Sequence, residues 1–255
     1  MEVHHSHQIP KKLKEYLTEF LMLFAAVTLG FFAENIREHQ IEKHREIQYL
    51  KNIHLDIQQD LNQIQRVSVY NTIKQNISKD LIELYSRGIQ TDLPKFYYLI
   101  KTLALRSEFQ HSSSGLEQLK NAGGLRLIED PEILHQIQLV EIRIGRIEAL
   151  QDFMEQNLLH FRLKTNLILD ALTVNEMNNK QLTDQSQKNA IVRRFSMPTS
   201  VRPLKLSDDK DINEIVNLAL SPVNTTMYIN SHLKELKKES MLLDKMLVDK
   251  FGDEF

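Results

Sequence analysis

Two different hydrophobic patterns follow one another in the first third of the chain. Residues 20–33, FLMLFAAVTLGFFA, are apolar without a charge. Further on, apolar residues recur every three or four positions, and neither Gly nor Pro occurs between positions 34 and 87. The recurring residues are Leu50, Ile53, Ile57, Leu61, Ile64, Val67, Tyr70, Ile73, Ile77, Leu81 and Leu84. This spacing predicts one long helix with a single apolar stripe, ended by Gly88.

The uninterrupted apolar run admits three interpretations. A buried core helix is compatible with its length, since 14 residues cover only about 21 Å. A cleaved signal peptide would place bulky Phe31 three residues before a cut after Ala33, where small residues are preferred. A transmembrane helix over residues 13–36 is long enough to cross a bilayer. We favour the transmembrane helix, because the dense apolar run gives way abruptly to a strongly polar helix.

Basic residues flank the apolar run on both sides. They are Lys11, Lys12 and Lys14 before it, and Arg37, Lys43 and Arg45 after it. The positive-inside rule gives a tie, but the upstream lysines are more concentrated. We therefore expect residues 1–12 to form a short cytoplasmic tail. Residues 37–255 would form a helical domain outside the inner membrane, in the periplasm.

The remaining patterns predict an all-α fold: a transmembrane helix continuing into a long helix, followed by an antiparallel helical bundle. Asp92 with Pro94, and Asp130 with Pro131, are pairs of N-cap and first-turn residues. The expected helices cover residues 37–86 (a stalk), 93–109, 115–121, 131–173, 208–220 and 222–250. Ser221-Pro222 should open the last helix, and the polar residues 175–189 predict a loop. We find no sustained alternation typical of strands.

The composition excludes several classes of protein. Lys and Arg number 32 against 34 Asp and Glu, so the chain lacks the basic excess of proteins that bind nucleic acid by bulk charge. Cysteine is absent, which excludes disulfides, thiol catalysis and cysteine-ligated metal centres.

Residues 114–128, SGLEQLKNAGGLRLI, have the pattern of a helical corner. Ser114 and Glu117 have capping-box spacing, and Gly123-Gly124 can reverse the chain through left-handed dihedrals. The leucines and isoleucine that would pack into the bundle are Leu116, Leu119, Leu125, Leu127 and Ile128. We interpret the motif as a packing corner, with a docking or hinge element as the alternative.

Three residues of the apolar helix are candidates for contact with a transmembrane partner. Glu19 is an ionisable residue near one boundary of the span, where it could pair with a partner helix or lie at the interface. Ala26 and Gly30 are four positions apart, a small-residue pair that permits close helix packing.

Other polar residues gave weaker signals for chemistry. The terminal His4, His5 and His7 could bind a metal only weakly, and His39, His44 and His54 lack the HExxH spacing of zinc hydrolases. Asp56 and Asp60 could ligate a cation but are expected to form a solvated acidic face.

His111 beside Ser112–Ser114 suggests a nucleophile, yet no GxSxG elbow, P-loop or GxGxxG motif occurs. Arg193-Arg194 is too short for a nucleic-acid surface. We therefore expect no enzyme activity, no cofactor and no metal site.

Two stretches of the chain resemble a bacterial family of single-pass membrane proteins of unknown function. They are residues 10–61, beginning PKKLKEYLTEFLMLF, and residues 114–128, followed by Asp130-Pro131. The positions that match the family's LxxLKxxGGLRLI-like motif are Glu117, Leu119, Gly123, Gly124, Leu125 and Leu127. The resemblance implies an inner-membrane anchor and a periplasmic helical domain. It implies no established activity and no catalytic residues.

Together these patterns predict a membrane-anchored, non-enzymatic interaction or scaffold protein. Its expected partners are the lipid bilayer and either another protein or a second copy of itself, with no nucleic acid and no small-molecule substrate. The alternative is an accessory subunit of an ion-driven inner-membrane transporter or motor complex, packing through its transmembrane helix. A third hypothesis is an enzyme whose site forms only in the fold.

Overall fold

A computed structural model describes residues 13–121, 123–179 and 195–255, and within them the chain is helical without a strand. The predicted all-α class is therefore confirmed. The elements are α1 (Leu13–Arg87), the 3₁₀ turn η1 (Ile89–Asp92), α2 (Leu93–Leu103), α3 (Ser114–Asn121), η2 (Gly124–Leu127), α4 (Pro131–Ile168), α5 (Ala171–Asn179), α7 (Asp209–Phe251) and η3 (Gly252–Glu254). The predicted tail 1–12, with its histidines and lysines, and Arg193-Arg194 lie outside the described residues.

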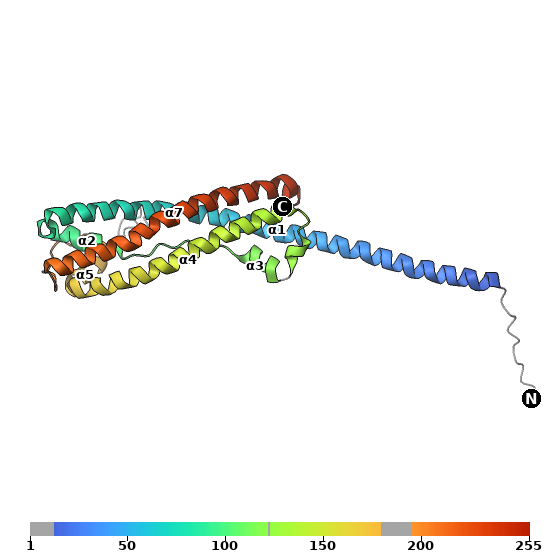
Figure 1. Cartoon of the computed structure of the whole chain (residues 1–255), viewed down its shortest axis with the longest axis horizontal. Helices are drawn as coiled ribbons and strands as arrows, with labels where there is room; N and C mark the ends of the chain where they lie inside the picture. The colour runs from blue at the N-terminus through green and yellow to red at the C-terminus, as the bar shows by residue number, and fades with distance from the viewer. Residues whose placement is uncertain (1–12, 122, 180–194) are drawn as a thin grey trace, which may run out of the picture.

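Helix α1 runs without interruption for 75 residues, about 110 Å. Residues 13–45 contain no buried side chain among those described and project away from the rest of the protein as the blue helix in Figure 1. From Glu46 onward one face of the same helix is buried. The prediction of an apolar helix that continues directly into a long helix is confirmed.

Three long helices form the bundle, and α7 packs along both α1 and α4 (Figure 1). Helix α7 runs antiparallel to the other two. Its start lies beside the end of α4, where Lys164 contacts Asp211, and its end lies beside the start of the packed part of α1. There Lys51 donates to the carbonyl oxygen of Phe255. The chain thus runs away from the apolar segment in α1 and α4 and returns in α7.

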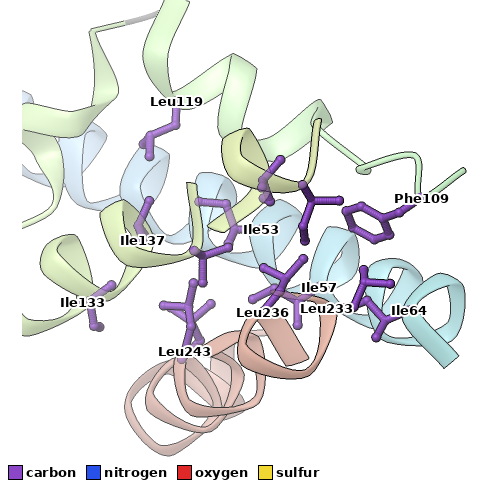
Figure 2. Packing of buried hydrophobic residues seen from close by; sticks show 14 of the residues in the cluster. Ile53, Ile57, Ile64, Phe109, Leu119, Ile133, Ile137, Leu233, Leu236 and Leu243 are labelled. Atoms are coloured by element: carbon purple, nitrogen blue, oxygen red, sulfur yellow. The ribbon is translucent and has the colours of Figure 1, made fainter. Parts of the chain in front are cut away.

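The core is divided into two clusters along this bundle. The cluster nearer the apolar segment joins α1, α3, α4 and α7, as Figure 2 shows through Ile53, Leu119, Ile137 and Leu243. The second cluster lies at the far end and surrounds Phe96, Tyr97 and Phe161, which are fully buried. Burying an aromatic or aliphatic side chain contributes about 1.5–3 kcal/mol, so these clusters hold the helices together.

Residues 104–113, which we name the strap, include the last part of the helix predicted over 93–109, and that part of the prediction is wrong. Helix α2 ends at Leu103, and the strap continues without helical structure from residue 106 toward α3. Side chains of α1 and α4 take over backbone hydrogen bonds that a helix would have made. Gln151 bonds both the amide and the carbonyl of Phe109, at 2.7 and 3.1 Å, and Asp60 accepts from the amide of Ser112 at 2.8 Å. The strap's backbone is therefore satisfied from outside itself.

Three further predicted boundaries differ from the structure. Helix α4 ends at Ile168, and Asp170 then caps α5 by accepting from the amides of Leu172 and Thr173. Residues 175–179 are consequently helical rather than loop, while residues 180–189 of that predicted loop lie outside the described part. Helix α7 continues through Pro222 instead of starting there, because the side chains on either side of it, Ala219 and Val223, are buried in the core.

The predicted helix caps are confirmed where the chain needed only local signals. Asp92 accepts from the amide of Lys95 at 3.0 Å, and Asp130 accepts from the amide of Glu132 at 2.9 Å. Gly88 ends α1 with a φ of 88°, in the region that favours glycine.

Candidate functional site

The most distinctive surface is the apolar segment of α1. Its large side chains are exposed on every side of the helix, for example Leu23 at 68% and Phe31 at 73%. Among the described residues, one helix, near the N-terminus, is long and apolar enough to cross a membrane, and none of its apolar window is buried inside the protein. Residues 13–36 cover about 36 Å, against about 30 Å for a hydrocarbon core.

The three candidate partner-contact residues share one face of this segment. Glu19, Ala26 and Gly30 are seven and four positions apart, which places them in line on an α-helix. Nothing lies within 4 Å of a Cβ built on Gly30, so the face around it is open. Glu19 is partly buried and already has an interaction within the chain. Their role as a partner contact stays a prediction.

At the corner, the predicted capping box between Ser114 and Glu117 is wrong. The Ser114 hydroxyl donates to Asp56 Oδ1 at 2.9 Å, and the Gly115 amide donates to Asp56 Oδ2 at 2.6 Å. Glu117 bonds instead to Ser113, accepting from its hydroxyl at 2.8 Å. The N-terminus of α3 is therefore capped by a carboxylate of α1, across 58 positions in sequence.

Gly115 is a site residue that the sequence analysis missed. A Cβ at this position would lie 2.6 Å from the Ile53 amide nitrogen and 2.7 Å from the Asn52 carbonyl carbon. No larger residue fits without a shift of one helix, so the backbones of α3 and α1 touch here. A glycine in the first turn of a helix is a weak sequence signal, and only the contact with α1 reveals its purpose.

The remaining corner residues hold η2 against the point where α1 enters the bundle. Gly123 has a φ of 64°, as its predicted left-handed conformation requires. Gly124 does not have a positive φ, but a Cβ there would lie 3.0 Å from Leu119 and Tyr49. Leu119 is fully buried (Figure 2), while Leu125 and Leu127 are half-buried. These placements agree with a packing corner.

A carboxylate of α1 also reaches the end of the corner. Glu46 is buried and its Oε1 accepts from the Glu129 amide at 3.2 Å. Burial raises the pKa of Glu46, and the hydrogen bond from Glu129 partly opposes that rise. Side chains of α1 thus hold both ends of the segment from α3 to the start of α4.

Asp56 and Asp60 do not form the solvated acidic face that we expected. They are 5% and 2% exposed, because the strap and α3 cover them. Asp60 Oδ2 lies 2.5 Å from His111 Nδ1, while its other oxygen accepts from Ser112. The helical spacing of the two aspartates predicted a shared face correctly but gave no signal for the segment that covers it.

The candidate serine nucleophiles are all committed to structural bonds. The Ser112 hydroxyl donates to Gln59 at 3.1 Å, Ser113 donates to Glu117 and Ser114 donates to Asp56, so none is paired with His111. Two of the histidines on the long helix are also bonded to other side chains. His54 bonds Asp244 at 2.7 Å, and His44 lies 3.0 Å from Gln48. The described residues contain no group of three potential metal ligands.

Comparisons with known proteins found no matching family model, no similar curated protein and no similar solved structure.

Proposed function

We propose that the chain is a membrane-anchored, non-enzymatic interaction protein whose helical bundle binds a protein partner or a second copy. The observation that carries the proposal is the continuity of α1. One helix bears a fully exposed apolar segment at one end and the packing stripe of the bundle at the other. About 10 residues, or 15 Å of helix, separate residue 36 from the first buried side chain at Glu46.

The non-enzymatic part of the proposal is supported by the use of the polar groups. An active site needs a nucleophile, a base and an oxyanion donor that converge. Here the buried polar side chains around the corner and the strap bond to backbone amides and carbonyls instead, as Asp56, Asp60 and Gln151 do. Such bonds fix the positions of the helices and commit these side chains to structural roles.

The proposed location is a bacterial inner membrane, with the N-terminus cytoplasmic and the bundle in the periplasm. The concentrated lysines at positions 11, 12 and 14 support this orientation, as does the resemblance of residues 10–61 and 114–128 to single-pass membrane proteins. Reporter fusions that are active on only one side of the membrane, placed at each terminus, test it. A C-terminal fusion active in the cytoplasm would contradict the orientation.

The interaction role is tested by photo-crosslinking in native membranes. One crosslinking residue replaces Phe153, which is 54% exposed on α4, and another replaces Met22 in the apolar segment. A binding bundle gives discrete crosslinked species from position 153 that comprise two copies of the chain or one copy with one partner. Adducts with lipid alone from position 22, together with no discrete species from exposed bundle positions, would contradict an interaction role.

The second candidate, an accessory subunit of an ion-driven membrane complex, is favoured by the helix face that Glu19, Ala26 and Gly30 share, which is open around Gly30. Purification in mild detergent distinguishes it. Co-purification of channel-type subunits that is lost in Glu19→Ala supports it, whereas an unchanged set of partners in that variant excludes a role for Glu19.

A further inference from the structure

A second polar region lies in the middle of the bundle, between α1 and the strap. It is a pocket of about 290 Å³. Its polar walls come from Gln63, Arg66 and Tyr70 of α1 and from Arg106, Ser107 and Glu108 of the strap. This volume accommodates a small molecule but not a peptide helix.

The charges around the pocket are predominantly positive. Arg106 pairs with Glu108 at 2.6 Å and lies 3.6 Å from Glu155. Arg66 makes no ion pair with any described residue, so no carboxylate in the described part of the chain neutralises this guanidinium. A guanidinium presents a planar fork of donors that matches the oxygens of carboxylate and phosphate groups.

A buried lysine adds to this excess. Lys74 lies one helical turn after Tyr70 on α1 and is only 1% exposed. It donates to the carbonyl of Leu105 in the strap. Its Nζ lies 5.5 Å from the ring centre of Tyr70, which lines the pocket. No described carboxylate forms an ion pair with it. Burying an ammonium group without a counter-charge is costly, and a nearby anion reduces that cost.

The same surroundings lower the pKa of Lys74 to about 7. Burial is the largest cause, and the charge of Arg162 adds to it, while Glu155 opposes it. Near neutral pH this amine is therefore close to the balance between its charged and neutral forms, and a bound anion would favour the charged form. The polar groups beside it also retain bonding capacity: Gln63 uses its amide oxygen for the Gln110 amide, at 3.2 Å, which leaves its own nitrogen as a donor.

We propose that the pocket between α1 and the strap binds a small soluble anion through a carboxylate or phosphate group. Arg66 and Arg106 would be the direct ligands, and the buried amine of Lys74 would supply a further positive charge. A headgroup of the anchoring membrane is excluded as the ligand by distance. Arg66 lies 30 positions beyond the end of the predicted span, which is about 45 Å along α1. Binding would join the strap to α1 and so couple the ligand to the packing of the bundle. The exclusion of a headgroup rests on the proposed membrane span, whereas the pocket and its charges do not depend on it.

The test is isothermal titration of the full chain in detergent micelles with inorganic phosphate and, separately, with succinate, at constant ionic strength held by sodium chloride. We expect saturable binding of one anion per chain. Arg66→Gln should weaken it about tenfold or more, since a charge-assisted bond to the anion is lost. Arg146→Gln, an exposed arginine of α4, is the matched control and should bind as the parent chain does.

Glu108→Gln gives an independent check with the opposite sign. Removing the carboxylate that competes for Arg106 should tighten binding, by about twofold to tenfold. Preference for phosphate or for succinate identifies the class of anion. The absence of saturable binding for both, or binding that responds to neither Arg66→Gln nor Glu108→Gln in variants that melt like the parent chain, would overturn the proposal.

Discussion

Residues 13–36 and residues 46–87 belong to one unbroken helix, yet their apolar side chains are distributed differently. In the first region they surround the helix, and Phe20, Leu23 and Phe31 are more than 60% exposed. In the second they follow one stripe, and Leu50, Ile53 and Ile57 are at most 5% exposed. A stripe can be covered by neighbouring helices, whereas a helix that is apolar all round needs an apolar solvent. The same backbone thus carries two side-chain patterns, one suited to an apolar solvent and one suited to packing against neighbouring helices.

The largest expected effect comes from charging the first region. Leu23→Arg with Val27→Arg places two charges in the span, at a cost of about 6 kcal/mol for insertion. We expect the double variant to leave the membrane fraction after ultracentrifugation without detergent. The control is Leu55→Arg with Val69→Arg, two residues that are each 49% exposed on the bundle. Equal sedimentation of both variants would contradict the membrane anchor.

The next effect lies in the second region, where α1 caps α3. Asp56→Ala removes the acceptor for the Ser114 hydroxyl and the Gly115 amide, two charge-assisted bonds, and should lower the free energy of unfolding by about 3 kcal/mol. Denaturant unfolding measures the loss. Asp152→Ala removes an exposed carboxylate of α4 and should change stability by less than about 0.5 kcal/mol. Similar values for the two variants would mean that the α1–α3 contact does not hold the corner.

The lowered pKa of Lys74 predicts how the free energy of unfolding depends on pH. Its pKa is about 7 in the folded chain and about 10.5 when unfolded, so between these values the unfolded state binds more protons. Stability should therefore rise as the pH increases from 7.5 to 9.5, by at most about 2.7 kcal/mol from this group. Lys74→Met should remove that rise. Melting temperatures across this range provide the measurement, and an equal rise in both proteins would place the titrating group elsewhere.

Two glycines give the smallest and sharpest comparison. Gly115→Ala forces a Cβ against the backbone of α1 and should destabilise the bundle by about 2 kcal/mol. Gly145→Ala, on an exposed part of α4 with nothing within 4 Å, should instead stabilise it by about 0.5–1 kcal/mol. Thermal unfolding distinguishes the signs. A neutral or stabilising Gly115→Ala would show that α3 can move away from α1 without loss.

Sequence patterns were sufficient for features that depend on neighbours along the chain. The apolar run, the stripe of the long helix and the caps at Asp92 and Asp130 were all predicted, because helical spacing and capping are local properties. The same reasoning failed where a bond crosses between elements. It assigned Ser114 a local cap that Asp56 supplies from 58 positions away, and it extended α2 into a strap that Gln151 and Asp60 hold.

The errors at Asp56, Asp60 and Pro222 share one cause. Each residue was interpreted from the general preference of its type. Carboxylates are usually exposed to water, and proline is common at the start of a helix. Packing around them reversed both preferences. A buried carboxylate is stable when backbone amides donate to it. Pro222 costs α7 a backbone hydrogen bond, and the buried residues around it, Ala219 and Val223, hold the helix together across it.

The absence of Gly and Pro from residues 31–87 has a mechanical consequence. A flexible linker would let the domain that it carries reach partners over a wide range of heights above its attachment point. With the proposed membrane anchor, a stiff helix would instead hold the bundle at a nearly constant height, so that contact with partners is confined to a layer parallel to the lipid surface. Partners outside that layer would stay out of reach, and the roughly 10 residues between residue 36 and Glu46 would set the distance of the layer from the membrane.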